Sequence, residues 1–514
     1  MIVIYHQYNK VVAIEREGKS IAFSQASIVK TLFEVASQYP GDLLIWCHID
    51  FKSNLNFSKI QDIFHHSKIM ASYNPFQDSY LPAAIGYVEE SPFIKVNKKV
   101  AYPTWQMSSC IGGIHASVLT ALQGNFYTIK DFDYFLHSIA KLLMSKGLLC
   151  YSEPDLLITF SEIIQKQKNS IFLLFRFVKQ HYKTSWIFLL FLNFLLYEKK
   201  IKFLPLIFSF FYSRIKINEN LLNDIKIQSA RKVIETGNID VIIPTIGREK
   251  YLKDVLTDLS LQTHLPKNII IVEQNPEPES VSELDYLISQ SWPFYIKHIF
   301  THQPGACNAR NLAIAEIKNE WVFMADDDIR LEKNFLELCF SFIENFGAEQ
   351  VTFGCYAPGY PQNKKINQKF QWPNFGSGCS IVKSKNIKDI LYNIGFEFGY
   401  GEDTDFGMQL RNSGFDILYA PNPEILHLKA PIGGFRTKPV LAWQKDVIQP
   451  KPSPTVMLYK ILNLSKQQIN GYRTVLFFKF YKAQAIKNPF LYFSTFNKQW
   501  KQSVYWANEL NNKK

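Results

Sequence analysis

Three consecutive aspartates, Asp326, Asp327 and Asp328, are the residues of this sequence best suited to chemistry. They follow residues 321–325, a continuously apolar run that predicts a short buried strand. Ligands of parallel sheets bind in the crevice outside such strand ends. Adjacent carboxylates repel one another, and a divalent cation that prefers oxygen ligands, Mg²⁺ or Mn²⁺, relieves the repulsion. The pattern therefore predicts a metal site, with a solvated acidic turn capping a helix that begins near Leu331 as the open alternative.

A basic residue, Arg310, occupies a position suited to binding an anion. It lies in the first part of a helix expected at 306–317, after a turn that contains Gly305. A guanidinium group at a helix start can bind a phosphate or the edge of a base. The alternative is an ordinary surface arginine, which the neighbouring Gly305 and Asn308 make less favoured.

Composition limits the classes of protein to which this chain can belong. Its 514 residues are enough for two or three domains, and 47% apolar with 20% charged residues indicates a globular protein. The net charge of +12 favours an anionic partner, but the basic residues border aliphatic runs, which argues against a nucleic-acid binder. Seven cysteines without CxxC spacing predict neither a zinc site nor a disulfide framework. Residues 1–6 lack the features of a signal peptide, so we expect a first strand there and a cytoplasmic location.

The hydrophobic pattern divides the chain into four segments, 1–155, 156–235, 236–440 and 441–514. In the first segment, strands are expected at 2–5 and 42–49, and helices at 27–37 and 132–144, the last closing at Gly147. In the third segment, strands are expected at 240–245, 268–272 and 321–325, and helices at 249–261, 306–317, 383–394 and 403–413. Both segments show the alternation of an α/β fold. The fourth segment is expected to be mostly helical and rich in aromatic residues.

Segment 156–235 is dense in Phe, Leu and Ile. Its three apolar runs, 171–178, 186–197 and 203–212, are each shorter than the roughly 20 residues that a membrane-spanning helix needs. Basic residues flank the runs: Lys179, Lys183, Lys199, Lys200, Lys202, Arg214 and Lys216. Short apolar runs with basic borders are typical of helices that lie in a membrane interface, so we expect peripheral attachment to the inner face of the cell membrane. An ordinary helical linker remains the alternative.

Residues 239 to about 437 carry a series of short motifs. In chain order these are 241–248 (VIIPTIGR), 270–275 (IIVEQN), 305–311 (GACNARN), the three aspartates, 376–379 (GSGC), 399–405 (GYGEDTD) and 427–431 (HLKAP). In this order and spacing the stretch resembles a family 2 glycosyltransferase domain of the GT-A fold. The resemblance implies a Rossmann-like α/β domain with a mixed, mostly parallel sheet, which takes a sugar from a nucleotide-diphosphate donor.

The resemblance also implies roles on the donor side of the site. Asp328 would hold the metal together with Asp326 and His427, and Asp326 would lie near the ribose or the sugar. The residues implied for nucleotide-sugar binding are Pro244, Thr245, Arg248, Glu273, Asn275, Arg310, Asp326 and Asp327. Glu273 stands where the family usually has an aspartate that contacts the base, so the nucleotide is left open. Lys429 with Gly433, Gly434 and Arg436 could form a loop that closes over the diphosphate.

On the acceptor side, the resemblance points to the acidic pair Glu402 and Asp403. Inverting members of the family use a carboxylate here as the general base that deprotonates the acceptor hydroxyl. We assign that role to Asp403, with Glu402 holding the geometry of the site. Compensation of the helix dipole, worth about 0.3–1 kcal/mol, is the alternative role for two acids at a helix start.

The first segment weakly repeats the third. Residues 44–50 resemble the strand that ends in the three aspartates, and residues 112–117 resemble 376–382. Only Asp50 stands where the three aspartates would be, and Phe135 and Leu136 fall where Glu402 and Asp403 would align. We therefore expect a degenerate, non-catalytic GT-A-like domain at 1–155. The alternative is that any two α/β domains look alike at this level.

These features together predict an inverting, metal-dependent glycosyltransferase that acts on a glycan or lipid-linked acceptor, in cell-surface polysaccharide synthesis. One alternative is a nucleotidyltransferase, although residues 245–248 form a poor phosphate-binding turn for it. The other is a non-catalytic sugar-binding scaffold, which suits 1–155 but not the intact acids of 240–437. The sequence leaves the oligomeric state, donor sugar and linkage open.

Overall fold

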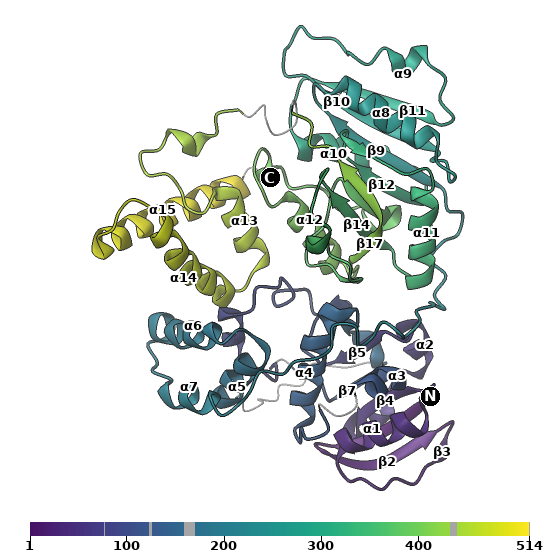
Figure 1. Ribbon diagram of the computed structural model, residues 1–514, viewed down its shortest axis with the longest axis vertical. Helices are drawn as coiled ribbons and strands as arrows, with labels where there is room; N and C mark the ends of the chain where they lie inside the picture. Colours follow the sequence, from purple (N-terminus) through teal and green to yellow (C-terminus); the bar gives the residue numbers. More distant parts are fainter. Residues whose placement is uncertain (77, 123–125, 159–169, 432–438, 513–514) are drawn as a thin grey trace. The chain divides into compact units, whose positions relative to one another are not determined.

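The computed structural model describes residues 1–76, 78–122, 126–158, 170–431 and 439–512 (Figure 1). The chain forms two compact units. Unit 1 contains residues 1–231 and 465–478, and unit 2 contains residues 232–464 and 479–514. Each unit is organised around its own mixed sheet, so the protein is a mixed α/β protein with two sheets.

The sheet of unit 2 has nine strands in the described residues, in the order β11-β10-β9-β12-β16-β14-β17-β13, with β15 paired to β17. The strands are β9 (Ile239–Thr245), β10 (Asn268–Gln274), β11 (Tyr295–Thr301), β12 (Trp321–Ala325), β13 (Ile329–Arg330), β14 (Gln350–Tyr356), β15 (Phe370–Gln371), β16 (Cys379–Lys383) and β17 (Leu418–His427). Strands β11, β10, β9 and β12 are parallel, and β16 runs antiparallel to both β12 and β14. All five residues of β12 are buried, as its continuous apolar run predicts.

The helices of unit 2 are α8 (Glu249–Ser260), α9 (Tyr286–Ser289), α10 (Ala306–Ile314), α11 (Phe335–Phe346), α12 (Glu402–Asn412), α13 (Pro454–Asn463) and α15 (Pro489–Asn511). Helices of this unit connect and cover the strands, and α13 packs against α12 and α15 beside them (Figure 1). Helix α10 packs on β9 and β10, and α11 packs on β17. Helix α11 ends at Gly347, whose φ of +59° is the left-handed conformation that glycine adopts without a Cβ clash.

The sheet of unit 1 follows the order β3-β2-β1-β4-β7-β5-β8-β6. The strands are β1 (Ile2–Gln7), β2 (Lys10–Arg16), β3 (Lys19–Ser20), β4 (Leu43–His48), β5 (Ile69–Tyr73), β6 (Tyr102–Pro103), β7 (Ile111–His115) and β8 (Leu149–Ser152). From β1 onward, each strand pairs with the same neighbour and in the same direction as its counterpart in unit 2: β1-β4-β7-β5-β8-β6 matches β9-β12-β16-β14-β17-β15. The internal repeat is thus present as a shared strand topology.

The helices of unit 1 are α1 (Ile28–Gln38), α2 (Ile60–Ile63), α3 (Ala116–Ala121), α4 (Phe132–Leu143), α5 (Ile171–His181), α6 (Ser185–Asn193) and α7 (Phe203–Ser209). A π-helical turn, η6 (Phe194–Glu198), continues α6. Helices α5 to α7 and η6 contribute Leu174, Phe175, Ile187, Leu206 and Phe194 to the same hydrophobic core as α1 and α4. The last long helix, α14 (Lys466–Ala483), has residues in both units. Across the described residues, no helix combines the length and the apolar character that a membrane span requires.

Most expected elements are confirmed to within a few residues, but the helix expected at 383–394 is wrong. Lys383 completes β16, where it pairs with Trp321 of β12, and short 3₁₀ turns follow at Ser384–Asn386 and Ile394–Phe396. Asn386 donates a hydrogen bond to Glu349, far from it in the chain, and Asn393 accepts one locally from the backbone N–H of Gly395. Such side-chain bonds compete with a helix. The helix expected near Leu331 begins at Phe335, after the short strand β13.

Candidate functional site

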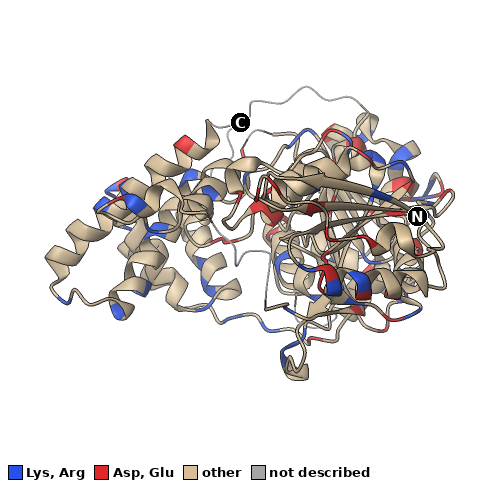
Figure 2. Ribbon diagram, turned by 90° about the horizontal axis from the view of Figure 1, so that it is seen from above, with Lys and Arg blue, Asp and Glu red and all other residues tan. Residues whose placement is uncertain are grey.

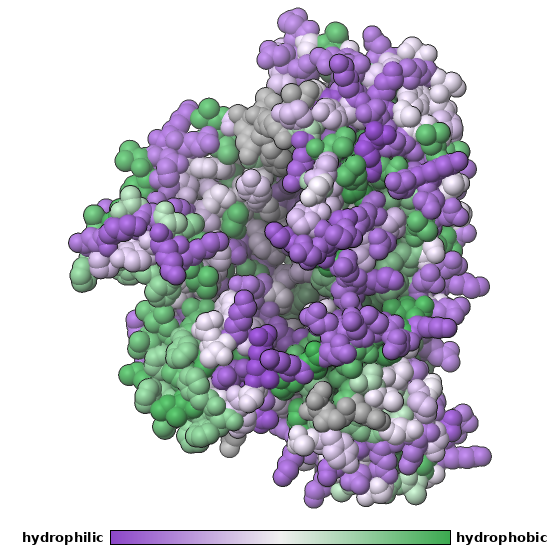
Figure 3. Space-filling model, in the orientation of Figure 1, coloured by the Kyte–Doolittle hydropathy of each residue, from purple (hydrophilic) through white to green (hydrophobic). Residues whose placement is uncertain are grey.

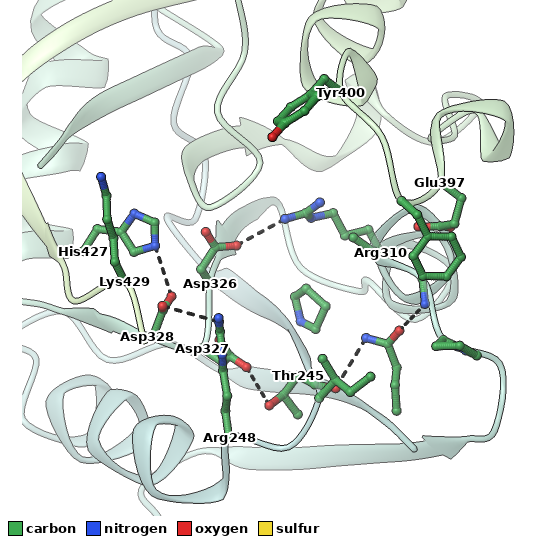
Figure 4. Close-up of a pocket in the computed structure, with 17 residues that line it drawn as sticks. Thr245, Arg248, Arg310, Asp326, Asp327, Asp328, Glu397, Tyr400, His427 and Lys429 are labelled. Carbon is green, nitrogen blue, oxygen red and sulfur yellow. Dashed lines mark hydrogen bonds and ion pairs between the residues drawn. The ribbon is translucent and has the colours of Figure 1, made fainter. Parts of the chain in front are cut away.

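A cavity of about 640 Å³ opens in unit 2 where β9 and β12 end (Figure 4). The ends of β9, β10 and β17, the residues that follow β9 and β12, the start of α10 and the turn before α12 form its wall. The lining residues are Pro244, Thr245, Ile246, Arg248, Gln274, Pro304, Gly305, Ala306, Arg310, Asp326, Asp327, Asp328, Glu397, Phe398, Tyr400, His427 and Lys429. The site therefore lies at the carboxyl edge of parallel strands, where the sequence predicts it.

Two of the three aspartates converge with a histidine. Ligand atoms of Asp326, Asp328 and His427 all lie within 4.8 Å of one another. Oδ1 of Asp328 is buried, accepts no hydrogen bond, and lies 3.2 Å from Nε2 of His427. Burial alone would raise the pKa of Asp328. Contacts with His427, the backbone N–H of Ala430 and Arg248 lower it by more, so the carboxylate stays ionised. Two carboxylates and one imidazole form a donor set that fits Mn²⁺ or Mg²⁺, and an oxygen without a hydrogen bond is available as a ligand.

The middle aspartate has a different environment. One oxygen of Asp327 accepts a hydrogen bond of 2.7 Å from the Thr245 hydroxyl, and the other lies 2.7 Å from the Arg248 guanidinium. Burial raises the pKa of Asp327 to about 6, although both partners favour the ionised form. Arg248 also reaches Asp328, at 3.4 Å. Asp327 thus fixes Thr245 and Arg248 on the cavity wall, where both were expected.

Arg310 projects from α10 toward the first aspartate (Figure 4). Its guanidinium lies 3.2 Å from Oδ1 of Asp326 and 5.5 Å from the centre of the Tyr392 ring. The Nε atom of Arg310 is buried and makes no hydrogen bond. A buried donor without an acceptor is costly, and an anionic ligand in the cavity would satisfy it.

The turn before α12 adds residues that sequence reasoning missed. Glu397 accepts hydrogen bonds of 3.0 Å from the backbone N–H groups of Cys307 and Asn308, at the start of α10. An added Cβ on Gly305 would lie 2.4 Å from Cδ of Glu397, so only glycine fits this approach. Phe398 and Tyr400 also line the cavity, and the Tyr400 ring is largely exposed. Their position in the glycine-rich turn beside Glu402 was the signal that could have identified them.

Glu402 and Asp403 begin α12 but are not among the residues that line the cavity. Asp403 accepts a short hydrogen bond from the Ser377 hydroxyl. Burial raises its pKa. Burial and the neighbouring Asp403 raise the pKa of Glu402 to about 7, and Oε2 of Glu402 is buried without a hydrogen bond. Glu402 therefore exchanges its proton near neutral pH, and Asp403 holds a proton more tightly than an aspartate in solution does.

Two residues expected in nucleotide binding do not line the cavity. The Glu273 carboxylate is occupied by the Ser282 hydroxyl, the backbone N–H of Glu283 and the His298 ring, at 2.6, 3.0 and 2.9 Å. Asn275 accepts a hydrogen bond from the backbone N–H of Glu277, within its own turn. Gln274, between them, does line the cavity and accepts a hydrogen bond of 2.6 Å from the backbone N–H of Gly305. Gly433, Gly434 and Arg436, expected in a closing loop, lie outside the described residues.

Parts of this sequence are similar to known proteins. Residues 240–399 match the family model described as glycosyl transferase family 2. The chain is 25% identical over 233 residues to the glycosyltransferase GlyG of Streptococcus pneumoniae, a match that covers 41% of this chain and 77% of that protein. It is 26% identical over 115 residues to an uncharacterized glycosyltransferase of Rickettsia conorii, covering 22% of this chain and 18% of that protein.

Solved structures with partial similarity include Staphylococcus aureus TarS 1-349 in complex with UDP-GlcNAc, at a TM-score of 0.34 and 18% identity, covering 46% of this chain and 70% of that one. Another is GalNAc-T7 with UDP, GalNAc and Mn²⁺, at a TM-score of 0.30 and 14% identity, covering 37% of this chain and 44% of that one. The family match, by contrast, spans the strands and turns that form the cavity from β9 to the turn before α12. Residues 240–399 therefore match a family 2 glycosyltransferase domain, and the chain that carries them is a glycosyltransferase.

Proposed function

We propose that this protein is an inverting, metal-dependent glycosyltransferase that moves a sugar from a nucleotide-diphosphate donor to a hydroxyl of a glycan or lipid-linked acceptor. The observation that carries the proposal is the convergence of Asp326, Asp328 and His427 on one cavity wall. Arg248 and Arg310 bring positive charge to the same wall. A cavity with a divalent-metal donor set and two guanidinium groups suits a diphosphate.

On the donor side, each group has a physical task. When bound at Asp326, Asp328 and His427, a divalent metal supplies the positive charge that offsets the charge developing on the leaving diphosphate. Arg310, held by Asp326, directs its unsatisfied Nε toward an anionic ligand. Arg248 is positioned by Asp327, so its geometry is set before the ligand binds, which limits the reorganisation needed during the reaction.

On the acceptor side, Asp403 accepts the proton of the acceptor hydroxyl as the oxygen attacks the anomeric carbon. The bond from that carbon to the diphosphate oxygen breaks, and the nucleoside diphosphate leaves with the electron pair. One such displacement inverts the anomeric centre. Ser377 fixes the Asp403 carboxylate, and Tyr400 offers an exposed ring at the cavity mouth on which an acceptor sugar can stack.

A donor screen tests this reaction. Purified protein is incubated with each common sugar nucleotide and with or without Mn²⁺, and release of the nucleoside diphosphate is measured. We expect release with one donor class, dependent on the metal, and an inverted anomeric configuration in the product. Full activity in excess chelator, or retention of configuration, would contradict the proposal.

The class of acceptor suggests where the enzyme works. We propose that it acts as a peripheral protein on a membrane surface, in the synthesis of a cell-surface polysaccharide. The support for this location is the exposed apolar surface of helices α5 to α7.

A further inference from the structure

Helices α5, α6 and α7 of unit 1 are apolar on two faces. One face packs in the core through residues such as Phe175, Ile187 and Leu206. The other face is exposed to solvent, and we call it the apolar face: Phe172, Phe188, Leu195, Leu196, Ile201, Phe203, Leu204, Ile207, Phe208, Phe210, Phe211 and Tyr212. Phe211 is 79% exposed and Ile201 is 72% exposed. A helix that only covers a core carries polar residues on its outer face. The apolar outer face of this segment is instead typical of a surface that binds another apolar surface.

The exposed side chains form a continuous surface. The rings of Phe172 and Phe208 lie 5.6 Å apart, and those of Phe208 and Phe211 lie 6.0 Å apart. The rings of Phe188 on α6 and Phe210 lie 6.0 Å apart, which joins α6 to the end of α7. The surface is visible as a large green area at the lower left of Figure 3, over the place of α5 to α7 in Figure 1. Scattered exposed apolar residues would not make such contacts with one another.

Positive charge borders the apolar face. Between residues 171 and 216 the acidic side chain is Glu198 alone. The cations of this range are Arg176, Lys179, Lys183, Lys199, Lys200, Lys202, Arg214 and Lys216. Lys183, Lys199 and Lys200 are exposed, and Lys202 borders an open apolar groove with Phe203 and Leu204. Elsewhere Lys and Arg are scattered over many helices, strands and loops (Figure 2).

The charge decides between the possible occupants of this surface. In a symmetric dimer formed through the apolar face, the cations of one copy would lie near the cations of the other. Like charges placed against each other at an interface cost on the order of several kcal/mol. An anionic lipid surface instead attracts each lysine near it. The aliphatic stems of the lysines can extend along the apolar surface while their ammonium groups reach the headgroups. Helices α5 to α7 are too short to span a bilayer, so the segment would lie in the interface plane.

We propose that the apolar face of α5 to α7 inserts into the headgroup and acyl boundary of a bilayer that contains anionic lipid. This inference rests on the proposed peripheral location of the enzyme and names the surface and the lipid class. The binding energy comes from two sources that can be separated: burial of Phe and Leu side chains in the acyl region, and attraction of lysines to anionic headgroups.

The test is cosedimentation of the full chain with vesicles of phosphatidylcholine alone or with a third of phosphatidylglycerol. We expect binding to the anionic vesicles that weakens in high salt. The double variant Phe208→Ser/Phe211→Ser should bind at least about tenfold more weakly at any salt, because its apolar area is lost. The double variant Lys199→Glu/Lys200→Glu should bind about tenfold more weakly at low salt, because the attraction to headgroups is lost.

Two matched controls separate these effects from general changes of surface. Ile288→Ser removes an aliphatic side chain that is 93% exposed in unit 2, and Lys98→Glu/Lys99→Glu reverses two exposed lysines of unit 1 that lie outside α5 to α7. Both controls should bind as the unchanged protein does. No binding of the unchanged protein, or equal binding of all variants, would overturn the proposal. So would a dimer in solution that Phe208→Ser/Phe211→Ser dissociates. Melting curves show that each variant is folded, and nucleotide release without vesicles, which these changes should not alter, tests the proposed reaction separately.

Discussion

At the scale of single residues, the three aspartates differ in their contacts. Asp327 is satisfied by Thr245 and Arg248, whereas Asp328 retains a buried oxygen without a hydrogen bond. Three identical side chains in sequence therefore have different environments. The residue types predict the cluster, but which oxygens remain free depends on contacts with residues about 80 positions earlier in the chain.

Asp328→Asn should lower turnover by about 10²-fold or more, because one charged ligand and its share of transition-state stabilisation are lost. The fold should be retained, since the amide fits the same space. The measurement is nucleotide release as a function of Mn²⁺ concentration, with metal binding followed separately by calorimetry. Asp285→Asn, at an exposed position of unit 2, serves as the control for a lost aspartate. Unchanged metal affinity in Asp328→Asn would reject its role as a ligand.

Asp403→Asn should keep the affinity for the donor nucleotide and lower transfer by about 10²–10⁴-fold, because a base acts on the acceptor and not on the nucleotide. Glu402→Gln should retain more activity. The readouts are donor affinity and the transfer rate at saturating donor. If Glu402→Gln abolishes transfer while Asp403→Asn does not, the two acids have exchanged roles.

The same pair predicts a pH dependence. Burial and Asp403 raise the pKa of Glu402 to about 7, and burial raises the pKa of Asp403, so both carboxyl groups hold protons more tightly than in solution. A protonated carboxyl cannot accept a proton from the acceptor. The transfer rate should therefore rise with pH as these carboxyl groups lose their protons, which for Glu402 happens near pH 7. Asp403→Asn, by removing a negative neighbour, should lower the pKa of Glu402. A transfer rate that is flat between pH 5 and 8 would contradict a carboxylate base with this environment.

At the scale of elements, the site depends on how closely β16 approaches the end of β12. These strands are antiparallel, and Ala325 pairs with Cys379, which puts Gly378 against Asp326. An added Cβ on Gly378 would lie 2.1 Å from Oδ2 of Asp326. Because the atom it meets is the end of a side chain, the aspartate would rotate rather than the sheet separate.

Gly378→Ala should therefore weaken metal binding and lower turnover by about 10–100-fold, with a small change in melting temperature. Gly41→Ala is the control, since an added Cβ there meets nothing within 4 Å. The two variants are compared by metal titration and by thermal unfolding. A large loss of stability in Gly378→Ala without any change in metal affinity would show that this glycine serves packing and not the site.

The elements themselves were largely predictable from local pattern. Strand β12 is a continuous apolar run, and α8 has helical spacing of its apolar residues, so both appear where expected. The helix predicted at 383–394 was wrong because Lys383 pairs with Trp321 and the side chain of Asn386 binds Glu349. These contacts favour a strand followed by turns, and the local sequence pattern does not record them. Glu397 and Tyr400 were missed because their roles arise from the approach of the turn before α12 to α10, which no local pattern records.

At the scale of the whole molecule, the two units have a common strand topology, but the cavity with the three aspartates belongs to unit 2. Unit 1 replaces the strand and helix pairs between β9 and α10 with the antiparallel hairpin β2-β3. In unit 2 that part includes Gln274, on the cavity wall. The pairing of Cys47 with Ile111 matches that of Ala325 with Cys379, which places His48 and Asp50 where Asp326 and Asp328 stand.

The structure also corrects the alignment of the acids. Helix α4 begins at Phe132, so Phe132 and Asp133 match Glu402 and Asp403, not Phe135 and Leu136. Asp133 accepts hydrogen bonds of 2.9 Å from the backbone N–H and the hydroxyl of Ser109, the same arrangement as Ser377 with Asp403. Burial raises the pKa of Asp133 to about 6. A carboxyl whose two oxygens are both held by Ser109 serves to fix the start of α4.

Unit 1 should matter for stability. Residues 465–478 of α14 belong to it, and Gly471 packs so closely on Tyr87 that an added Cβ would lie 2.3 Å from its carbonyl oxygen. Deletion of residues 1–150 would leave this helix and α5 to α7 without their core. We expect a lower melting temperature and aggregation, measured by thermal unfolding and light scattering. A truncated protein with unchanged melting and acceptor use would show that unit 2 is self-sufficient.

Asp50→Asn, in contrast, should leave turnover nearly unchanged. Asp50 is exposed, and its near partner is His48, 3.4 Å away, a ligand that a hard cation accepts less readily than oxygen. A metal there would have one carboxylate, whereas Asp326, Asp328 and His427 supply two carboxylates and an imidazole. In unit 1 the hairpin β2-β3 also stands in place of β10 and β11, and β10 carries Gln274 on the cavity wall of unit 2. Asp50→Asn and Asp328→Asn are therefore assayed side by side for nucleotide release and metal affinity. A loss in Asp50→Asn as large as that in Asp328→Asn would show that unit 1 has a working site of its own, because no structural role of an exposed Asp50 could cause it.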